Sequence, residues 1–254
     1  MTIIKPILNF LPRTLLIKIS IIIRPILKIY YYGSKFIDPI DGSGYRKFLP
    51  YGYNIERENA LCPGTFSLER HRYLWLYLIN ETNFTKQKLK VLHIAPEQVF
   101  LAKFKKNKYW NYTTLDLFSP LADVKADICD LPFEKNKFDL IICNHVLEHI
   151  DNDLLAIKEL YRVLKKGGCG IFQVPINENS EKTFQNNKIT DFKKRTEVFG
   201  QYDHLRVYGK DYYSLLRSVG FKVNAVDYLK KIDPKLSILY CLPKNEKIPI
   251  VYKN

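Results

Sequence analysis

The stretch Lys90-Val91-Leu92-His93-Ile94-Ala95-Pro96-Glu97 is a short apolar run that follows a polar linker and ends at a proline ahead of a helix-like segment. Such a run is typical of the first strand of an open parallel sheet, and the loop after that strand is where these folds bind nucleotide-like cofactors. That loop usually carries glycines, because a residue without Cβ lets backbone amides approach the ligand. This stretch has none, so by itself it is weak evidence for a cofactor site.

Strand and helix signals alternate after this stretch, which indicates a parallel sheet covered by helices on both faces. The run 138–143 is apolar on both alternating faces, as expected of a central strand buried on both sides. A polar insertion at 176–208 interrupts the pattern. The predicted strands are 90–95, 109–117, 124–128, 138–146, 169–175, 221–229 and 248–253, and the predicted helices are 67–80, 97–106, 152–165 and 210–219.

The composition bounds the function without naming it. The 254 residues are 46% hydrophobic, enough for one sizeable core and a smaller accessory element. The 40 basic and 26 acidic residues give a net charge of +14, which predicts attraction to nucleic acid, a membrane surface or a phosphorylated substrate. Because the basic residues are spread along the chain, a solvated lysine-rich surface explains the charge equally well. Five cysteines without a C-x-x-C pair favour a reducing cytoplasm.

Residues 1–32 are rich in Ile, Leu and Tyr, but basic residues interrupt them. No uncharged run approaches the roughly 18 residues of a spanning helix, and no cleavage site of a secretory signal follows. Pro12 and Pro25 predict a helix from about 12 to 24, with Pro25 as its end. Its basic face and broad apolar face suit either an anionic membrane surface or docking on the main domain.

The carboxyl ends of the predicted strands are informative together, because ligands of such sheets bind there. The second strand ends at Asp116, about twenty residues after the first turn, where a carboxylate can accept hydrogen bonds from ribose hydroxyls. Asp127 beside Ile128 offers an acceptor and an apolar face suited to an adenine. The central strand ends in Asn144 and His145. The sequence therefore predicts a nucleotide-like cofactor at this edge.

Three blocks carry a resemblance to a known family: Ala126-Asp127-Ile128-Cys129-Asp130-Leu131-Pro132-Phe133, Phe138-Asp139-Leu140-Ile141-Ile142-Cys143-Asn144-His145-Val146-Leu147-Glu148-His149-Ile150 and Leu160-Tyr161-Arg162-Val163-Leu164-Lys165-Lys166-Gly167-Gly168. In order and spacing they resemble the core of class I S-adenosylmethionine-dependent methyltransferases of the type 11 group, over roughly residues 88–230. The resemblance implies an α/β, Rossmann-like fold with a mixed, mostly parallel seven-stranded sheet flanked by helices, a small N-terminal accessory element, and S-adenosyl-L-methionine as the cofactor. The cofactor-binding residues expected are His93, Ala95, Glu97, Asp116, Leu117, Asp127, Ile128 and Asn144.

A closer resemblance is to a bacterial subgroup whose first strand also reads like Val91 to Glu97 and whose insertion resembles Phe199-Gly200-Gln201-Tyr202-Asp203-His204-Leu205-Arg206-Val207-Tyr208-Gly209. Against the general family pattern, His93 stands where an acidic residue usually ends the first strand. Ala95 and Glu97 stand where glycines are usual. Glu97 could hold the cofactor's ammonium in place of the missing acid, or be a first-turn residue that faces solvent and favours the helix dipole.

The same subgroup commonly carries a zinc-ribbon-like element with two C-P-x-C pairs ahead of the methyltransferase domain. Here Asp38-Pro39-Ile40-Asp41 and Cys62-Pro63-Gly64-Thr65 stand in their place, so one cysteine of four remains. Two carboxylates, a thiol and a hydroxyl make a poor tetrahedral zinc site. We expect no zinc there, assign no metal ligands elsewhere, and expect the element's shape to be kept by packing of Phe48, Tyr51 and Tyr53.

Three histidines are candidates for taking a proton from an acceptor, because imidazole titrates near neutrality. His145, nearest the end of the central strand, leads, with shaping of the cofactor pocket as its alternative role. His149, one turn further on, equally suits a structural role. His204 lies in the insertion that is expected to roof the cleft. Residues expected to contact substrate in that insertion are Tyr202, Asp203, Arg206 and Tyr208.

The basic, apolar front segment and the roofed cleft favour an anionic or lipid-linked acceptor, and the resemblance to the subgroup implies methyl transfer to an oxygen of a glycan or small molecule. An RNA or protein methyltransferase is an alternative, although no recognisable RNA-binding module is present and nucleic acid is not the expected partner. A non-catalytic scaffold that keeps the fold is another, motivated by the missing glycines and zinc ligands. We expect a cytoplasmic chain, with an apolar and basic segment (1–32) suited to the inner face of a membrane, an accessory element (33–80) and a methyltransferase domain (81–254).

Overall fold

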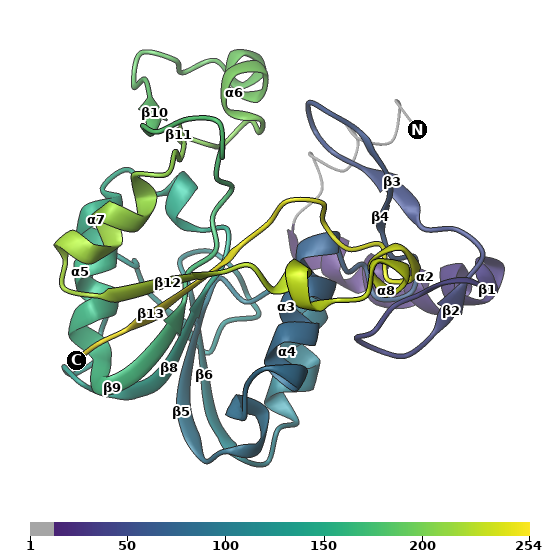
Figure 1. Ribbon diagram of the computed structural model, residues 1–254, viewed down its shortest axis with the longest axis horizontal. Coiled ribbons are helices and arrows are strands. Elements are labelled where there is room, and N and C mark those ends of the chain that lie inside the picture. Colours follow the sequence, from purple (N-terminus) through teal and green to yellow (C-terminus); the bar gives the residue numbers. More distant parts are fainter. Residues whose placement is uncertain (1–12) are drawn as a thin grey trace. The chain divides into compact units, whose positions relative to one another are not determined.

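The computed structural model describes residues 13–254 (Figure 1), which form two compact units. The first unit contains the described residues up to Tyr51 together with 57–76 and 232–244. The second contains 52–56, 77–231 and 245–254. The sequence-based division at residues 32 and 80 did not foresee that residues near the C-terminus belong to the first unit. All site residues described below lie in the second unit.

The second unit is built on one sheet of seven strands, in the order β12-β13-β9-β8-β5-β6-β7. Numbered along the chain, this order is 3-2-1-4-5-7-6 read from β7, so it reverses between β5 and β8. Only β13 runs antiparallel to its neighbours, which confirms the expected mixed, mostly parallel sheet. The strands are β5 (Leu89–Ile94), β6 (Trp110–Asp116), β7 (Val124–Lys125), β8 (Phe138–Cys143), β9 (Leu164–Ile171), β12 (Lys222–Val226) and β13 (Ile248–Tyr252).

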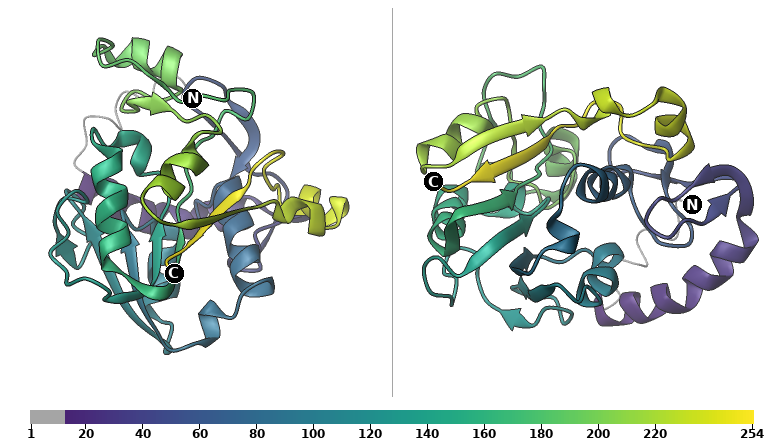
Figure 2. Two further views of the ribbon diagram at one scale, coloured as in Figure 1. Left: turned by 60° about the vertical axis from the view of Figure 1, so that its left-hand side comes forward. Right: turned by 60° about the horizontal axis from the view of Figure 1, so that its bottom comes forward.

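Helices cover both faces of this sheet, as two views of the ribbon show (Figures 1 and 2). Side chains alternate between the faces along β5. Leu92 and Ile94 belong to one large apolar core with residues of α5 and α7, whereas His93 packs beside Phe104 of α4 on the other face. The helices are α4 (Gln98–Lys105), α5 (Asp153–Val163) and α7 (Tyr212–Ser218).

The strand predicted at 169–175 begins earlier than expected, at Leu164. Its pairing with β8 shifts register between Phe138 and Leu140, so the residues between Leu164 and Cys169 form a bulge. Gly167 adopts a left-handed φ of 73° there, a conformation that glycine reaches without a steric cost. Gly167 therefore lies in an irregularity within the strand.

The first unit begins with helix α2 (Arg13–Tyr30), which runs through Pro25. The expectation that Pro25 ends this helix is wrong. An interior proline removes one backbone donor, but the preceding turn is reinforced because the Arg24 guanidinium donates to the carbonyl and hydroxyl oxygens of Ser20 at 3.3 and 3.1 Å. Within residues 13–254, no helix is long and apolar enough to cross a membrane.

The rest of the first unit consists of short hairpins and helices joined through Arg72. The Arg72 side chain is fully buried and donates to the carbonyls of Ser67, Ala60, Tyr240 and Cys241. These bonds explain why residues 232–244 return to this unit. Its elements are β1 (Tyr32–Ile37), β2 (Gly44–Tyr45), β3 (Leu49–Tyr51), β4 (Arg57–Leu61), most of α3 (Glu69–Asn80) and α8 (Pro234–Leu239).

The positions that resemble lost zinc ligands are tied together by hydrogen bonds. The Asp38 carboxylate accepts from the hydroxyls of Thr65 and Ser67 and from the Ile40 amide. Cys62 is buried beside it, and burial followed by the charge of Asp38 raises the pKa of its thiol to about 12. A thiol that holds its proton so firmly is a poor metal ligand.

The packing expected for this element is confirmed only in part. Phe48 is fully buried against Phe36, Tyr45 and Cys62. Tyr53, by contrast, is 46% exposed and is grouped with the second unit. The prediction that Tyr53 helps to keep the shape of this element is therefore wrong.

Candidate cofactor and proton-transfer site

The backbone turns sharply at the carboxyl ends of β5 and β8, the two strands between which the sheet order reverses. Ala95 (φ 47°) follows β5, and His145 (φ 52°) lies two residues beyond β8. Their amides donate to the carbonyls of Leu115 and Gln173 at 2.7 and 2.8 Å. A left-handed conformation costs a residue with a Cβ roughly 1–2 kcal/mol, and such strain collects at functional sites. Two strained residues therefore flank the point where open sheets bind ligands.

The first loop is held by a buried histidine. His93 is fully buried, with Nε2 2.6 Å from the Glu97 carboxylate and Nδ1 2.7 Å from the Tyr112 hydroxyl. Burial, with the charges of Glu97 and Asp123, raises the pKa of Tyr112, so its hydroxyl stays protonated beside Nδ1. Because a carboxylate only accepts, the hydrogen bond on the other side of the ring runs from Nε2–H to Glu97. The reading in which Glu97 faces solvent is wrong, because its side chain is 15% exposed and turned toward His93.

The two acidic residues expected at the cofactor site each use one oxygen to shape their own loop. Asp116, at the end of β6, accepts from the amides of Phe118 and Ser119 at 2.8 and 2.6 Å. Asp127 accepts from the Cys129 amide at 2.8 Å. These bonds fix the direction of the carboxylates.

Asn144 offers an unsatisfied donor at the same edge. Its side chain is 4% exposed, and its oxygen lies 3.4 Å from the Gln173 amide. Its buried Nδ2 has no hydrogen-bond partner among residues 13–254. Leaving a buried donor unpaired costs about 1–3 kcal/mol, so this atom is suited to a ligand's acceptor. The carboxylates of Asp116 and Asp127 accept hydrogen bonds and Asn144 Nδ2 donates one, and S-adenosylmethionine has hydroxyl, amino and carboxylate groups that can pair with both kinds. The two apolar residues expected to bind the cofactor differ in exposure, since Leu117 is 41% exposed and Ile128 is buried.

A buried carboxylate lies next to His145. Glu148, in the short helix η2 (Leu147–His149), is 1% exposed, and its Oε1 lies 3.4 Å from His145 Nδ1. Burial alone would raise the pKa of Glu148, but the contact with His145 and the charges of His145 and His149 outweigh it and lower that pKa. The carboxylate thus stays ionised and can hold the imidazole of His145 in one orientation.

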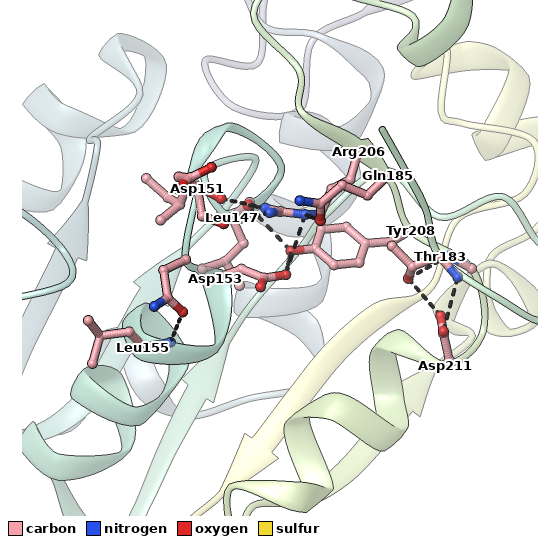
Figure 3. A network of polar contacts seen from close by, with 12 residues as sticks. Leu147, Asp151, Asp153, Leu155, Thr183, Gln185, Arg206, Tyr208 and Asp211 are labelled. Atoms are coloured by element: carbon pink, nitrogen blue, oxygen red, sulfur yellow. Dashed lines mark hydrogen bonds and ion pairs between the residues drawn. The ribbon is translucent and has the colours of Figure 1, made fainter. Parts of the chain in front are cut away.

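The polar insertion is fastened onto the loop after β8 (Figure 3). Arg206 is 2% exposed, and its guanidinium donates to the carbonyls of Leu147, Ile150 and Asp151. The Tyr208 hydroxyl donates to the Asp153 carboxylate at 2.6 Å. Both side chains are committed to the chain itself, which disfavours the expected substrate contacts, so we assign them a positioning role instead.

This fastening brings His204 beside Glu148 and His149. The Leu205 amide donates to the Glu148 carbonyl at 3.0 Å, and the rings of His149 and His204 lie 4.7 Å apart. Burial lowers the pKa of His204. Tyr202 and Asp203 remain partly exposed beside this group. Sequence reasoning missed Glu148, although the spacing His145-x-x-Glu148-His149 was a signal for it.

Comparisons with known proteins agree with this architecture. Residues 80–172 match the family model described as "Methyltransferase domain". An uncharacterized protein of Methanocaldococcus jannaschii, MJ0638, is 35% identical over 132 residues, which cover 51% of this chain and 55% of that protein. A demethylmenaquinone methyltransferase of Staphylococcus carnosus is 30% identical over 109 residues, 43% of this chain and 44% of that enzyme. The chain thus spans about half the length of these relatives.

Among solved structures, an Archaeoglobus fulgidus SAM-dependent methyltransferase is similar, with a TM-score of 0.45 and 15% identity over 74% of this chain and 95% of that one. The seven-stranded sheet order, the flanking helices and the matched family model together confirm the Rossmann-like class I methyltransferase fold and S-adenosylmethionine as its cofactor. Residues 80–172 of this chain thus match a methyltransferase domain, and they lie in a unit whose sheet has the Rossmann-like class I strand order.

Proposed function

We propose that this protein transfers a methyl group from S-adenosylmethionine to a hydroxyl oxygen of a glycan, lipid-linked or small-molecule acceptor, with His145 as the proton acceptor. The observation that carries the proposal is the pair of strained residues, Ala95 and His145, at the carboxyl ends of β5 and β8. They flank the position where the sheet order reverses, and His145 is the only titratable side chain of the two. His145 therefore combines a side chain able to accept a proton with a position at the edge of the sheet where we expect the cofactor.

The chain's own part in this reaction is alignment and proton removal. When bound, S-adenosylmethionine supplies a methyl group already activated by the positive sulfur. Asp116, Asp127 and Asn144 would hold it at the strand ends, beside the loop that Glu97 and His93 fix. As the acceptor oxygen forms its new bond, the hydroxyl proton moves to His145, which Glu148 orients from 3.4 Å.

The choice of an apolar or lipid-linked acceptor is supported by helix α2 and by one relative. Ile21, Ile22, Ile26 and Ile29 of α2 are 59–79% exposed, and an exposed apolar stripe on a basic chain suits an anionic membrane surface. The similar Staphylococcus carnosus enzyme is named for demethylmenaquinone. We propose that α2 brings the protein to the membrane face where such an acceptor lies.

Titration calorimetry with S-adenosylmethionine, followed by transfer of a labelled methyl group to acceptor pools, tests the function. We expect His145→Asn to retain cofactor affinity and to lose turnover by about 100-fold or more, the scale of a positioned general base. Unchanged turnover in this variant would remove His145 from the reaction. No binding of millimolar cofactor by the wild type would favour the non-catalytic scaffold. The hydrogen bond between Glu97 and His93 would then be purely structural.

Sedimentation with vesicles tests the membrane contact separately. Ile22→Glu and Ile26→Glu should lower binding to anionic vesicles, because each places a carboxylate on the apolar stripe. The matched control is Ile238→Glu on α8, where the side chain is 71% exposed but lies outside α2. Equal binding by all three variants would contradict the role of α2.

A further inference from the structure

We propose that Glu148, His149 and His204 form a binding site for a divalent transition-metal ion, with zinc as the test ion. One ligand atom from each of the three residues lies within 4.8 Å of the others, and no other such group occurs within residues 13–254. Glu148 and His149 follow β8, whereas His204 comes from the insertion. Metal binding does not depend on the proposed methyl transfer, since it requires neither cofactor nor acceptor.

Both imidazoles are oriented as metal-binding histidines usually are, with one ring nitrogen donating to an acceptor of the protein. His204 Nδ1 lies 3.0 Å from the Phe199 carbonyl. His149 Nδ1 lies 3.3 Å from the carbonyl and 3.4 Å from the carboxylate of Asp203. Because these partners only accept, each Nδ1 carries a proton and each Nε2 keeps the lone pair that a metal needs.

The Asp203 carboxylate is itself held in place. Gln201 Nε2 donates to its Oδ1 at 2.8 Å, while its Oδ2 faces His149. Such a carboxylate–histidine arrangement fixes the ring and increases its strength as a ligand.

Glu148 supplies an independent indication of a missing cation. Its side chain is 1% exposed, and by geometry neither carboxylate oxygen accepts a good hydrogen bond from the described residues. Among them its ion-pair contact is with His145, whose Nδ1 lies 3.4 Å from Oε1, which leaves the second oxygen without a partner. Buried carboxylates are normally paired, hydrogen-bonded or bound to a metal, and a dication between Glu148 and the two imidazoles would satisfy the oxygens.

The donor set selects the class of ion. Two imidazoles and one carboxylate suit Zn²⁺ and its transition-metal neighbours, and such three-ligand sites leave a coordination position open. Ligands around one Zn²⁺ at 2.0–2.1 Å lie about 3.3 Å apart, so the three side chains must draw together on binding. The hydrogen bond from the Leu205 amide to the Glu148 carbonyl already holds the two segments side by side, so we expect side-chain rotation to close the remaining distance.

A metal at this place would fasten the insertion to the loop after β8, in addition to the bonds made by the Arg206 guanidinium and the Leu205 amide. Because Glu148 also contacts His145, the open coordination position would lie near the proposed proton acceptor. This site is distinct from the residues that resemble a zinc ribbon, since Cys62 and Asp38 lie in the first unit.

Zinc titration of the tag-free, chelator-treated full-length chain tests the inference, with Co²⁺ absorption as a second readout. We expect one equivalent of Zn²⁺ to bind to the wild type. His204→Ala and the isosteric Glu148→Gln should each weaken binding by more than the roughly 10–100-fold typical of losing an orienting partner. Asp203→Asn, which alters only such a partner, should weaken it by about 10-fold.

Two controls keep the result interpretable. Cys62→Ala and His71→Asn remove a thiol and an imidazole of the first unit and should leave one equivalent of zinc bound. Loss of zinc in Cys62→Ala would place the metal in the ribbon-like element and overturn the inference. So would a wild type that binds less than one equivalent, or folded Glu148→Gln and His204→Ala variants that bind as the wild type does.

Discussion

His93 and Glu97 form a partly buried hydrogen bond of 2.6 Å across the first loop, from the second-last residue of β5 to the residue that precedes α4. The loop that lacks glycines is thus fixed by side chains. The Glu97 side chain makes no capping hydrogen bond to α4, and its carboxylate bonds to His93 instead.

Removing the Glu97 carboxylate should show how much the hydrogen bond to His93 contributes to the free energy of unfolding. Glu97→Ala leaves a ring nitrogen of the fully buried His93 without its acceptor, which should lower the free energy of unfolding by about 1–3 kcal/mol. Glu97→Gln keeps an acceptor and should cost less. Urea denaturation measures both, with Glu181→Ala as the exposed control. Equal losses in Glu97→Ala and Glu181→Ala would show that the bond contributes nothing.

Ala95 should accept glycine without harm. Its φ of 47° is strained for a residue with a Cβ, so Ala95→Gly should be neutral or stabilising by up to about 1 kcal/mol. The same substitution at Ala156, inside α5, should destabilise by about 1 kcal/mol or more. Thermal unfolding compares the two variants, and a large loss of stability in Ala95→Gly would contradict the strained backbone.

Arg206 should matter for stability more than for cofactor affinity. Arg206→Ala leaves several carbonyls of the 147–151 loop without donors, and we expect about 3 kcal/mol of lost stability and faster proteolysis within the insertion. Arg217→Ala, on an exposed face of α7, should change stability by less than about 0.5 kcal/mol. A stable Arg206→Ala variant that loses only acceptor affinity would restore the substrate contact expected from the sequence.

Cys62 should resist alkylation in the folded protein. Its pKa is raised to about 12 from an ordinary value of 9.0, so folding favours the protonated thiol. The resulting stabilisation is present below pH 9.0 and is lost as the pH rises toward about 12. Mass spectrometry after iodoacetamide treatment at mildly alkaline pH should find Cys62 unmodified until denaturant is added. Rapid modification without denaturant would indicate an ionised or exposed thiol.

Much of the fold could be predicted because it depends on local patterns. The run Phe138–Cys143 is apolar on both alternating faces, which predicts a strand buried on both sides, and it forms the central strand β8. Pro25 shows the limit, since sequence rules treat an interior proline as a stop while neighbouring side chains allow the helix to continue. The bulge at Gly167 depends on register with β8, which local sequence does not encode.

The position of the candidate site could be predicted from the ends of the strands, but the partners of its side chains could not. Asp116, Asn144 and His145 follow strands and therefore meet at one edge. The partners of Glu97 and Arg206 depend on tertiary packing. Glu97 bonds to His93 and Arg206 bonds to backbone carbonyls of the loop after β8, and no local sequence pattern specifies either contact. The group of Glu148, His149 and His204 needs an insertion to fold back over 50 residues, as the Leu205–Glu148 bond shows.

A crystal structure of the full-length protein grown with millimolar S-adenosylmethionine tests the central claim most directly. We predict cofactor density over the carboxyl ends of β5, β6 and β8, in contact with Asp116 and Asn144 and with the methyl group directed toward His145. Density at another edge of the sheet, or no bound cofactor with calorimetry equally silent, would contradict it.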